Sequence, residues 1–114
     1  MEGEIMKLSE LEKKSGLKAV NQYTDKEIEG VYISDMVSDI ITTAKANVIL
    51  ITLQTHKSLI AAANLVDVAA IVFAKGKKPA EDVVGLASKA GIALFSTDAD
   101  TWTFASKLIE LGIK

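Results

Sequence analysis

The chain has 114 residues, of which 49% are hydrophobic and 25% charged, with a formal net charge of -2. These values indicate a single folded domain over residues 1–114 and exclude a disordered chain. Because the chain has no cysteine, it excludes disulfides, thiolate zinc sites and cysteine nucleophiles. Because it has no dense basic block, it excludes a surface that holds a nucleic-acid backbone. The start of the chain does not resemble a signal peptide and no apolar run is long enough to span a membrane, so we expect a cytoplasmic protein without a membrane partner.

The first elements of the chain have the weakest patterns. Residues 7–15 are predicted to form a helix, in which Ser9 and Glu12 have capping-box spacing and Gly16 is the stop. Residues 17–23 alternate apolar and polar side chains, which favours a short edge strand or an extended segment.

A strand and an amphipathic helix are predicted next. Residues 28–34 form the predicted strand, and Asp35 follows as a natural helix N-cap. The helix after it has one apolar face, made by Val37, Ile40, Ile41 and Ala44.

The most informative stretch is residues 47–76. Residues 48–53 and 68–73 are continuous, apolar runs rich in β-branched side chains, which is typical of central strands buried on both faces. Between them, residues 59–66 are apolar on nearly every side, so this helix has no water-facing stripe and must pack on more than one side. The three elements predict a right-handed crossover between two parallel strands.

The last third of the chain repeats the alternation of helix and strand. Pro79 opens a predicted helix that ends at Gly91, and residues 92–95 form a further buried strand. A polar turn then leads into a last helix, whose apolar stripe contains Phe104, Leu108 and Leu111. The whole order predicts an α/β fold, a three-layer α/β/α sandwich with a mainly parallel sheet.

If the strands are parallel, four polar turns share one edge of the sheet, where open α/β folds bind ligands. The candidate ligand-binding residues on this edge are Ser34, Asp35, Gln54, Thr55, His56, Lys75, Gly76, Thr97 and Asp98. Helix N-termini, Lys75 and Gly76 would allow a phosphate or carboxylate to approach closely. The alternative is that the hydroxyls and carboxylates only cap helices.

Several single residues have competing interpretations. His56, the only histidine, could bind a ligand, satisfy a turn or pack at an interface, and the sequence offers no set of metal ligands around it. Asp98 and Asp100 could hold a cation, although capping of the last helix is the simpler explanation. The turn at Lys75 lacks the glycine and hydroxyl spacing of a kinase phosphate loop. Trp102 is expected to be a core or interface anchor.

From about residue 48 to residue 108 the chain resembles the DRTGG domain, a regulatory module similar to the N-terminal domain of HPr kinase/phosphorylase and found in phosphotransacetylases and CBS-domain pyrophosphatases. The resemblance rests on four ordered features: ITLQTH at 51–56, the alanine-rich helix after it, VAAIVFAKG at 68–76 with Pro79 after it, and GIALFSTDADTWTFASKL at 91–108. The chain departs from the letters that name the family, of which only Gly76 is kept. The QTH form looks like a stand-alone branch that is often encoded beside iron-hydrogenase subunits.

The resemblance implies a fold like that of the HPr kinase N-terminal domain, pairing of two copies, and a sensing task that involves an adenine nucleotide or another anionic metabolite. The residues favour pairing on separate grounds, because an apolar helix at the surface of a small domain needs a covering partner, and Ala61, Ala62 and Ala63 allow a second helix to approach closely. The alternative is that this helix is simply buried within the domain. We therefore expect a homodimeric regulatory or ligand-binding module that is not an enzyme and has no cofactor.

Two alternatives differ in class. One is a protein-interaction accessory subunit of a redox complex, without a small ligand. The other is a small enzyme that acts on a phosphorylated metabolite through His56 with Asp35 or Asp98.

Overall fold

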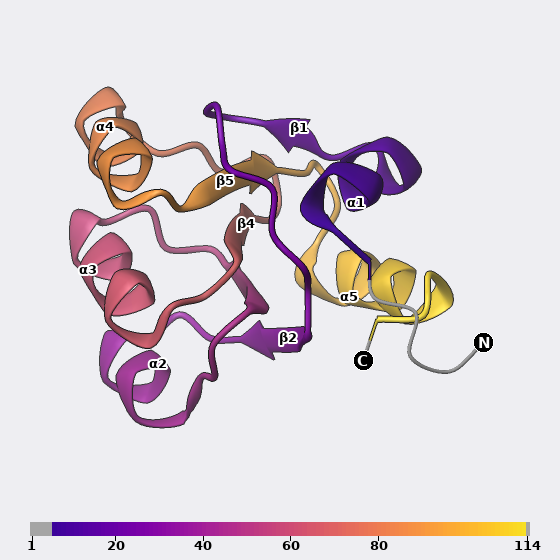
Figure 1. Cartoon of the computed structure of the whole chain (residues 1–114), viewed down its shortest axis with the longest axis horizontal. Coiled ribbons are helices and arrows are strands. Elements are labelled where there is room, and N and C mark those ends of the chain that lie inside the picture. The colour runs from indigo at the N-terminus through magenta and orange to yellow at the C-terminus, as the bar shows by residue number, and fades with distance from the viewer. Residues whose placement is uncertain (1–5, 114) are drawn as a thin grey trace.

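The computed structural model describes residues 6–113, which form five helices and five strands (Figure 1). In chain order they are α1 (Leu8–Ser15), β1 (Lys18–Ala19), β2 (Gly30–Ile33), α2 (Val37–Thr43), β3 (Val48–Thr52), α3 (Lys57–Val66), β4 (Ala70–Phe73), α4 (Glu81–Ala90), β5 (Ala93–Ser96) and α5 (Thr101–Glu110). Within this part of the chain, no helix is long and apolar enough to cross a bilayer.

The strands form one sheet in the order β1-β5-β4-β3-β2. Strands β2 to β5 are parallel, and β1 pairs antiparallel with β5 at the edge. In this register Tyr32, Leu50, Ile71 and Leu94 stand side by side across the sheet. The mainly parallel sheet and the crossover between β3 and β4 agree with the sequence prediction.

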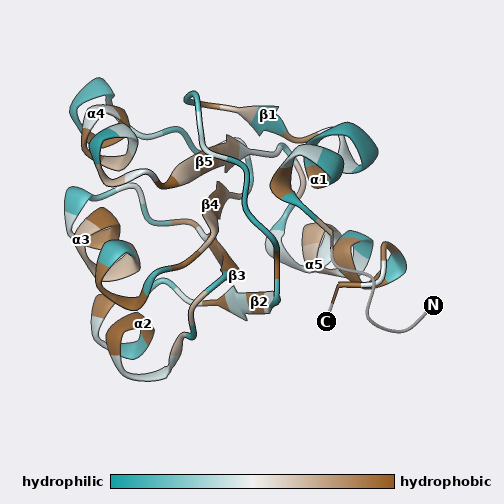
Figure 2. Ribbon diagram, viewed as in Figure 1, coloured by the Kyte–Doolittle hydropathy of each residue, from teal (hydrophilic) through white to brown (hydrophobic). Residues whose placement is uncertain are grey.

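The sheet lies between two layers of helices (Figures 1 and 2), and alternate strand residues pack toward the two layers. Ile49 and Ile51 pack in the cluster that includes α1 and α5, whereas Leu50 between them packs in the cluster with α2, α3 and α4. Both faces of β3 are therefore covered, which explains why its sequence is a continuous apolar run rather than an alternating one. The prediction of a three-layer α/β/α sandwich is confirmed.

Helix α3 lies between α2 and α4 and packs on the sheet, so the prediction of packing on more than one side is correct. The prediction that it has no water-facing stripe is wrong. Ala61 and Leu65 are exposed, and Leu65 exposes 68% of its surface. Ala62 and Ala63 are buried within the domain, so only Ala61 of the three alanines is accessible to a partner.

The predicted capping box of helix α1 is also wrong. The helix begins one residue later than predicted, with Lys7 as N-cap, and the Glu10 carboxylate accepts a hydrogen bond from the Lys7 N–H at 3.2 Å. Ser9 is used elsewhere, because its N–H and its hydroxyl donate to the Asp25 carboxylate at 3.0 and 2.6 Å. Although burial opposes the shift, these bonds lower the pKa of Asp25. Ser9 therefore bonds to a residue sixteen positions away in the sequence instead of capping its own helix.

The predicted edge strand at residues 17–23 is confirmed as β1, which is only two residues long. Gly16 ends α1 in the left-handed conformation, with φ 73°, as predicted. Asn21 continues the pairing beyond β1, because its side-chain amide accepts from the Leu94 N–H at 2.9 Å and donates to the Ile92 carbonyl at 3.0 Å. A side chain thus replaces backbone pairing where the short strand ends.

The helix starts differ from the predictions at two positions. The N-cap of α2 is Met36 rather than Asp35, and the N-cap of α4 is Ala80, so Pro79 precedes the helix instead of lying in its first turn. The last helix follows the prediction, because the Asp100 carboxylate accepts a hydrogen bond from the N–H of Thr103.

We predict that Ile49→Ala lowers the free energy of unfolding by about 2–5 kcal/mol, because it opens a cavity between the sheet and α5. Ile109→Ala is the matched control, since Ile109 is 64% exposed on α5 and its loss should cost no more than about 0.5 kcal/mol. Urea unfolding measures both values. Equal losses in the two variants would contradict the two-sided burial of β3.

Candidate functional site

The four turns that follow β2, β3, β4 and β5 lie on one edge of the sheet, which we call the rim. Backbone hydrogen bonds join neighbouring turns: Ser34 donates to the Ile51 carbonyl at 3.2 Å, Ala74 to that of Thr52 at 3.1 Å, and Thr97 to that of Phe73 at 3.0 Å. All nine predicted candidate residues therefore belong to one continuous edge, in the strand order β2, β3, β4, β5.

Asp35 connects the first two turns. Its carboxylate accepts hydrogen bonds from the Thr52 hydroxyl at 2.9 Å and from the Leu53 N–H at 2.7 Å. Thr52 is 1% exposed, and its hydroxyl also accepts from the N–H of Gln54 at 3.1 Å. Asp35 is thus a structural bridge to the end of β3, which is the physical reason why it does not cap α2.

Other candidate side chains are also used within their own turns. The hydroxyls of Ser34 and Thr97 each accept a hydrogen bond, at 3.2 Å, from the backbone N–H two residues later. The hydrogen bond from Thr103 lowers the pKa of Asp100, although partial desolvation opposes the shift, and the positive charge of Lys75 lowers it further. The capping alternative is therefore supported for Asp100, whereas the Ser34 and Thr97 hydroxyls stabilise their turns without capping a helix.

In the turn after β4, backbone N–H groups form hydrogen bonds with carbonyl groups of the rim. Lys75 and Gly76 both have left-handed conformations, with φ 58° and 69°. Their N–H groups donate to carbonyls of the turn after β5 at 2.8 Å, and the N–H of Lys77 donates back to Ala74 at 3.1 Å. A Cβ on Gly76 would lie 3.4 Å from a carboxylate oxygen of Asp98. The N–H groups of Lys75, Gly76 and Lys77 are therefore not available to an anion.

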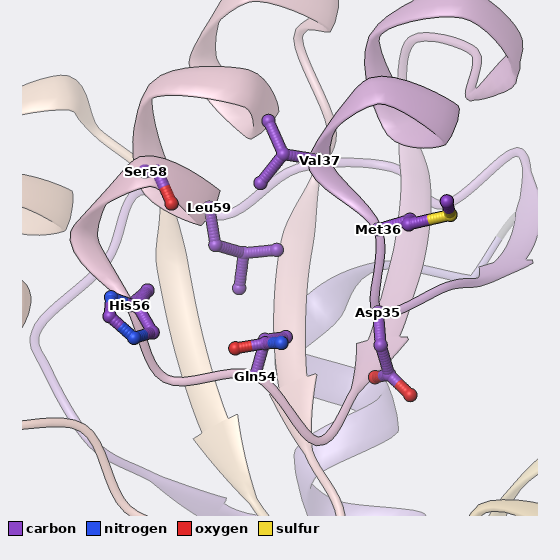
Figure 3. A pocket seen from close by; sticks show the side chains of 7 residues that line it. All are labelled: Asp35, Met36, Val37, Gln54, His56, Ser58 and Leu59. Atoms are coloured by element: carbon purple, nitrogen blue, oxygen red, sulfur yellow. The ribbon is translucent and has the colours of Figure 1, made fainter.

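An open pocket of about 320 Å³ lies between the starts of α2 and α3 (Figure 3). Its lining residues are Asp35, Met36, Val37, Gln54, His56, Ser58 and Leu59. The N-caps of the two helices, Met36 and His56, make no side-chain capping hydrogen bond. The positive end of α3 therefore faces the pocket without a carboxylate or hydroxyl cap.

The polar groups of the pocket differ from the rest of the rim. Across residues 6–113, nothing forms a hydrogen bond with the side chains of Gln54, His56 or Ser58. Figure 3 shows Gln54 and His56 next to each other below Leu59, whereas the Asp35 carboxylate points away from them. The pocket thus presents an amide, an imidazole and a hydroxyl that are available to a ligand.

The pocket unites only part of the predicted set. Asp35, Gln54 and His56 line it, while Lys75, Gly76, Thr97 and Asp98 lie along the other half of the rim. Ser34 and Thr55 belong to the turns beside it without lining it. The sequence prediction missed Ser58 and an apolar wall of Met36, Val37 and Leu59. The one feature of the sequence that could have indicated these residues is their position at the predicted starts of two helices that border the rim.

A hydrogen bond fixes α2 beside the pocket. The Tyr32 hydroxyl of β2 donates to the Asp39 carboxylate of α2 at 2.7 Å. This bond lowers the pKa of Asp39 and raises that of Tyr32. The wall that α2 contributes is therefore held by a polar contact as well as by the burial of Ile40.

Two further predictions concern residues outside the pocket. Trp102 is 77% exposed, so its expected place in the core is wrong and an interface role is left. In the described part of the chain, no group of three or more His, Asp or Glu side chains is arranged to hold a metal ion.

Comparisons with known proteins identify a family and a fold. The sequence profile of the DRTGG domain matches residues 15–111. A similar solved structure contains the CBS and DRTGG domains of the regulatory region of Clostridium perfringens pyrophosphatase, complexed with its activator diadenosine tetraphosphate; the TM-score is 0.68 at 18% sequence identity. The match covers 87% of this chain and 44% of that chain. A search of the curated proteins finds no match.

We predict that Asp35→Ala lowers the free energy of unfolding by about 1–3 kcal/mol, because the buried Thr52 hydroxyl and the Leu53 N–H lose their acceptor. Asp98→Ala is the matched control. The Asp98 side chain is exposed and has no hydrogen bond within residues 6–113, so its removal should change stability by less than about 0.5 kcal/mol. If chemical denaturation gives the two variants the same stability, Asp35 is not a bridge.

Proposed function

This chain belongs to the DRTGG domain family, and we propose that it is a non-catalytic regulatory module that binds a small anionic ligand in the rim pocket. The observation that carries the proposal is the contrast between two sets of rim side chains. Asp35 and Thr97 are used by the fold, whereas Gln54, His56 and Ser58 have no protein partner among the described residues. Polar groups that the fold leaves unused around a cavity are what a ligand site requires.

An adenine nucleotide is the first ligand to test. The Clostridium perfringens regulatory region, which contains a DRTGG domain, was crystallised with diadenosine tetraphosphate, and this supports a nucleotide as the ligand class to examine. The pocket itself supports an aromatic body with an anionic end. Val37 and Leu59 offer an apolar wall, and the uncapped start of α3 favours negative charge.

The surroundings of His56 among the described residues support its role as a ligand contact. A histidine that acts as a general base needs a group that orients its ring. Asp35 is hydrogen-bonded to the end of β3 and points away from His56 (Figure 3), and Asp98 lies in the turn after β5. His56 is therefore proposed as a ligand contact.

We predict that AMP raises the melting temperature of the protein. A ligand that binds only the folded state stabilises it by mass action, so at AMP concentrations above Kd the shift should grow with the logarithm of the AMP concentration. Gln54→Ala should remove this shift. Asn64→Ala is the matched control, because it deletes the same amide from an exposed position near the other end of α3 and should leave the shift intact. An unchanged shift in Gln54→Ala would refute the pocket as the binding site.

We also propose that the module acts as a homodimer through the outer surface of the layer formed by α2, α3 and α4. Each helix of this layer exposes a large apolar side chain: Ile41 at 41%, Leu65 at 68% and Leu86 at 43%. Ala61 is exposed one turn before Leu65 and would allow a second helix to approach closely. Exposed apolar residues that gather on one surface are typical of interaction sites.

For the pairing, light scattering should give a mass of twice 12.2 kDa. Leu65→Glu should halve this mass, because a carboxylate would be buried without a partner at the interface. Lys14→Glu on α1, an exposed position of the opposite helical layer, is the control and should remain dimeric. A monomeric mass for the unaltered chain at high concentration would refute the proposal.

A further inference from the structure

Building on the proposed function, we infer that the pocket selects ligands with a single phosphate or carboxylate group on a compact apolar or aromatic body, such as a nucleoside monophosphate, and gains no affinity from further phosphates. Three features of the rim lead to this inference. They are the size of the pocket, the supply of hydrogen-bond donors and the balance of charge around it.

The pocket is small for a nucleotide with a long phosphate chain. Its volume of about 320 Å³ lies at the lower end of the range of roughly 300–1,000 Å³ in which proteins bind small molecules. Its lining combines apolar side chains, Met36, Val37 and Leu59, with the neutral polar side chains of Gln54, His56 and Ser58. Asp35 also lines it, but its carboxylate is held by hydrogen bonds from the Thr52 hydroxyl and the Leu53 N–H. There is room for one compact body and one polar end.

The start of α3 supplies donors for one anionic group. The N–H of Leu59 donates to the His56 carbonyl at 3.1 Å, whereas those of Lys57 and Ser58 have no acceptor in the described chain. The Ser58 hydroxyl lies in the same turn, and the His56 imidazole lies at its N-cap. These donors all belong to the N-cap and first turn of α3, where the positive end of the helix favours an anion.

Beyond the pocket, the other donors among the described rim residues are less suited to additional phosphates. The next turn along the sheet uses the N–H groups of Lys75, Gly76 and Lys77 for its own hydrogen bonds. The start of α4 leaves the N–H groups of Glu81 and Asp82 without an acceptor, but the two carboxylates of these residues offset the positive end of that helix. All 13 basic residues of the chain are lysines, so the planar, bidentate phosphate contacts that arginine makes are absent.

The charges of the rim are balanced rather than positive. Four lysines (Lys57, Lys75, Lys77 and Lys78) share it with five carboxylates (Asp35, Glu81, Asp82, Asp98 and Asp100). Lys57 approaches Asp82 with an N–O distance of 4.0 Å, and Lys75 interacts electrostatically with Asp100. Each added phosphate therefore encounters carboxylates as well as lysines, and its charge gains no net attraction.

Titration calorimetry without divalent cations, using adenosine, AMP, ADP and ATP, tests the inference. We expect AMP to bind at least tenfold more tightly than adenosine, and ADP and ATP to bind no more tightly than AMP. His56→Ala should bring the affinity for AMP close to that for adenosine. Lys77→Ala, outside the pocket, should leave the affinity for AMP unchanged.

Two results would overturn the inference while leaving the proposed function in place. One is an affinity that rises steadily from AMP to ATP, particularly if Lys77→Ala removes the increase. The other is equal binding of adenosine and AMP, which would show that the start of α3 contributes no anion site. If none of the four compounds binds, the proposed function and this inference both fail.

Discussion

The burial of the parallel strands on both faces is the constraint on which the rest of the structure depends. Among residues 6–113, the buried polar side chains are those of Thr52 and Ser96, and each is the last residue of its strand. The three central strands, β3, β4 and β5, have no place for polar chemistry before their last residues, because helices cover both of their faces. Polar groups are therefore confined to the turns, and the parallel direction brings four of these turns to one edge.

The same constraint explains how much of the fold can be predicted from the sequence. A strand covered on both faces has a continuous apolar sequence, and residues 48–53 and 68–73 were identified from it close to their observed bounds, Val48–Thr52 and Ala70–Phe73. The sequence rules for helix capping gave the wrong residue where a group that is distant in the sequence forms the hydrogen bond instead. Ser9 has the spacing of a capping residue, but Asp25 takes both of its hydrogen bonds, and no window of the sequence contains that contact.

The candidate site could be predicted as an edge but not as a pocket. Parallel strands imply that the four turns meet, whereas the role of each polar residue depends on contacts between strands. Asp35 looks like a helix cap in sequence, yet it bonds to Thr52, seventeen residues away. Gln54 has no such partner within the described chain, and nothing local distinguishes it from Asp35. Separating residues that hold the rim together from residues available to a ligand therefore required the structure.

The match to the DRTGG profile spans residues 15–111, which include all four turns of the rim. One of these turns depends on Gly76, which has a left-handed conformation next to Asp98, where a residue with a side chain would be strained. The buried strands and the geometry of this turn therefore determine where the rim lies, whereas the side chains around the pocket determine what it offers to a ligand.

The central claim is that the unused side chains at the start of α3 form the ligand site. Its most direct test is a set of two-dimensional amide NMR spectra recorded while AMP is added. The account predicts that the signals of residues 35–37 and 54–59 move together and saturate, while those of α1 and α5 stay in place. Signals that move along the turn at Lys75–Lys77 or on α5, with the start of α3 unaffected, would contradict it.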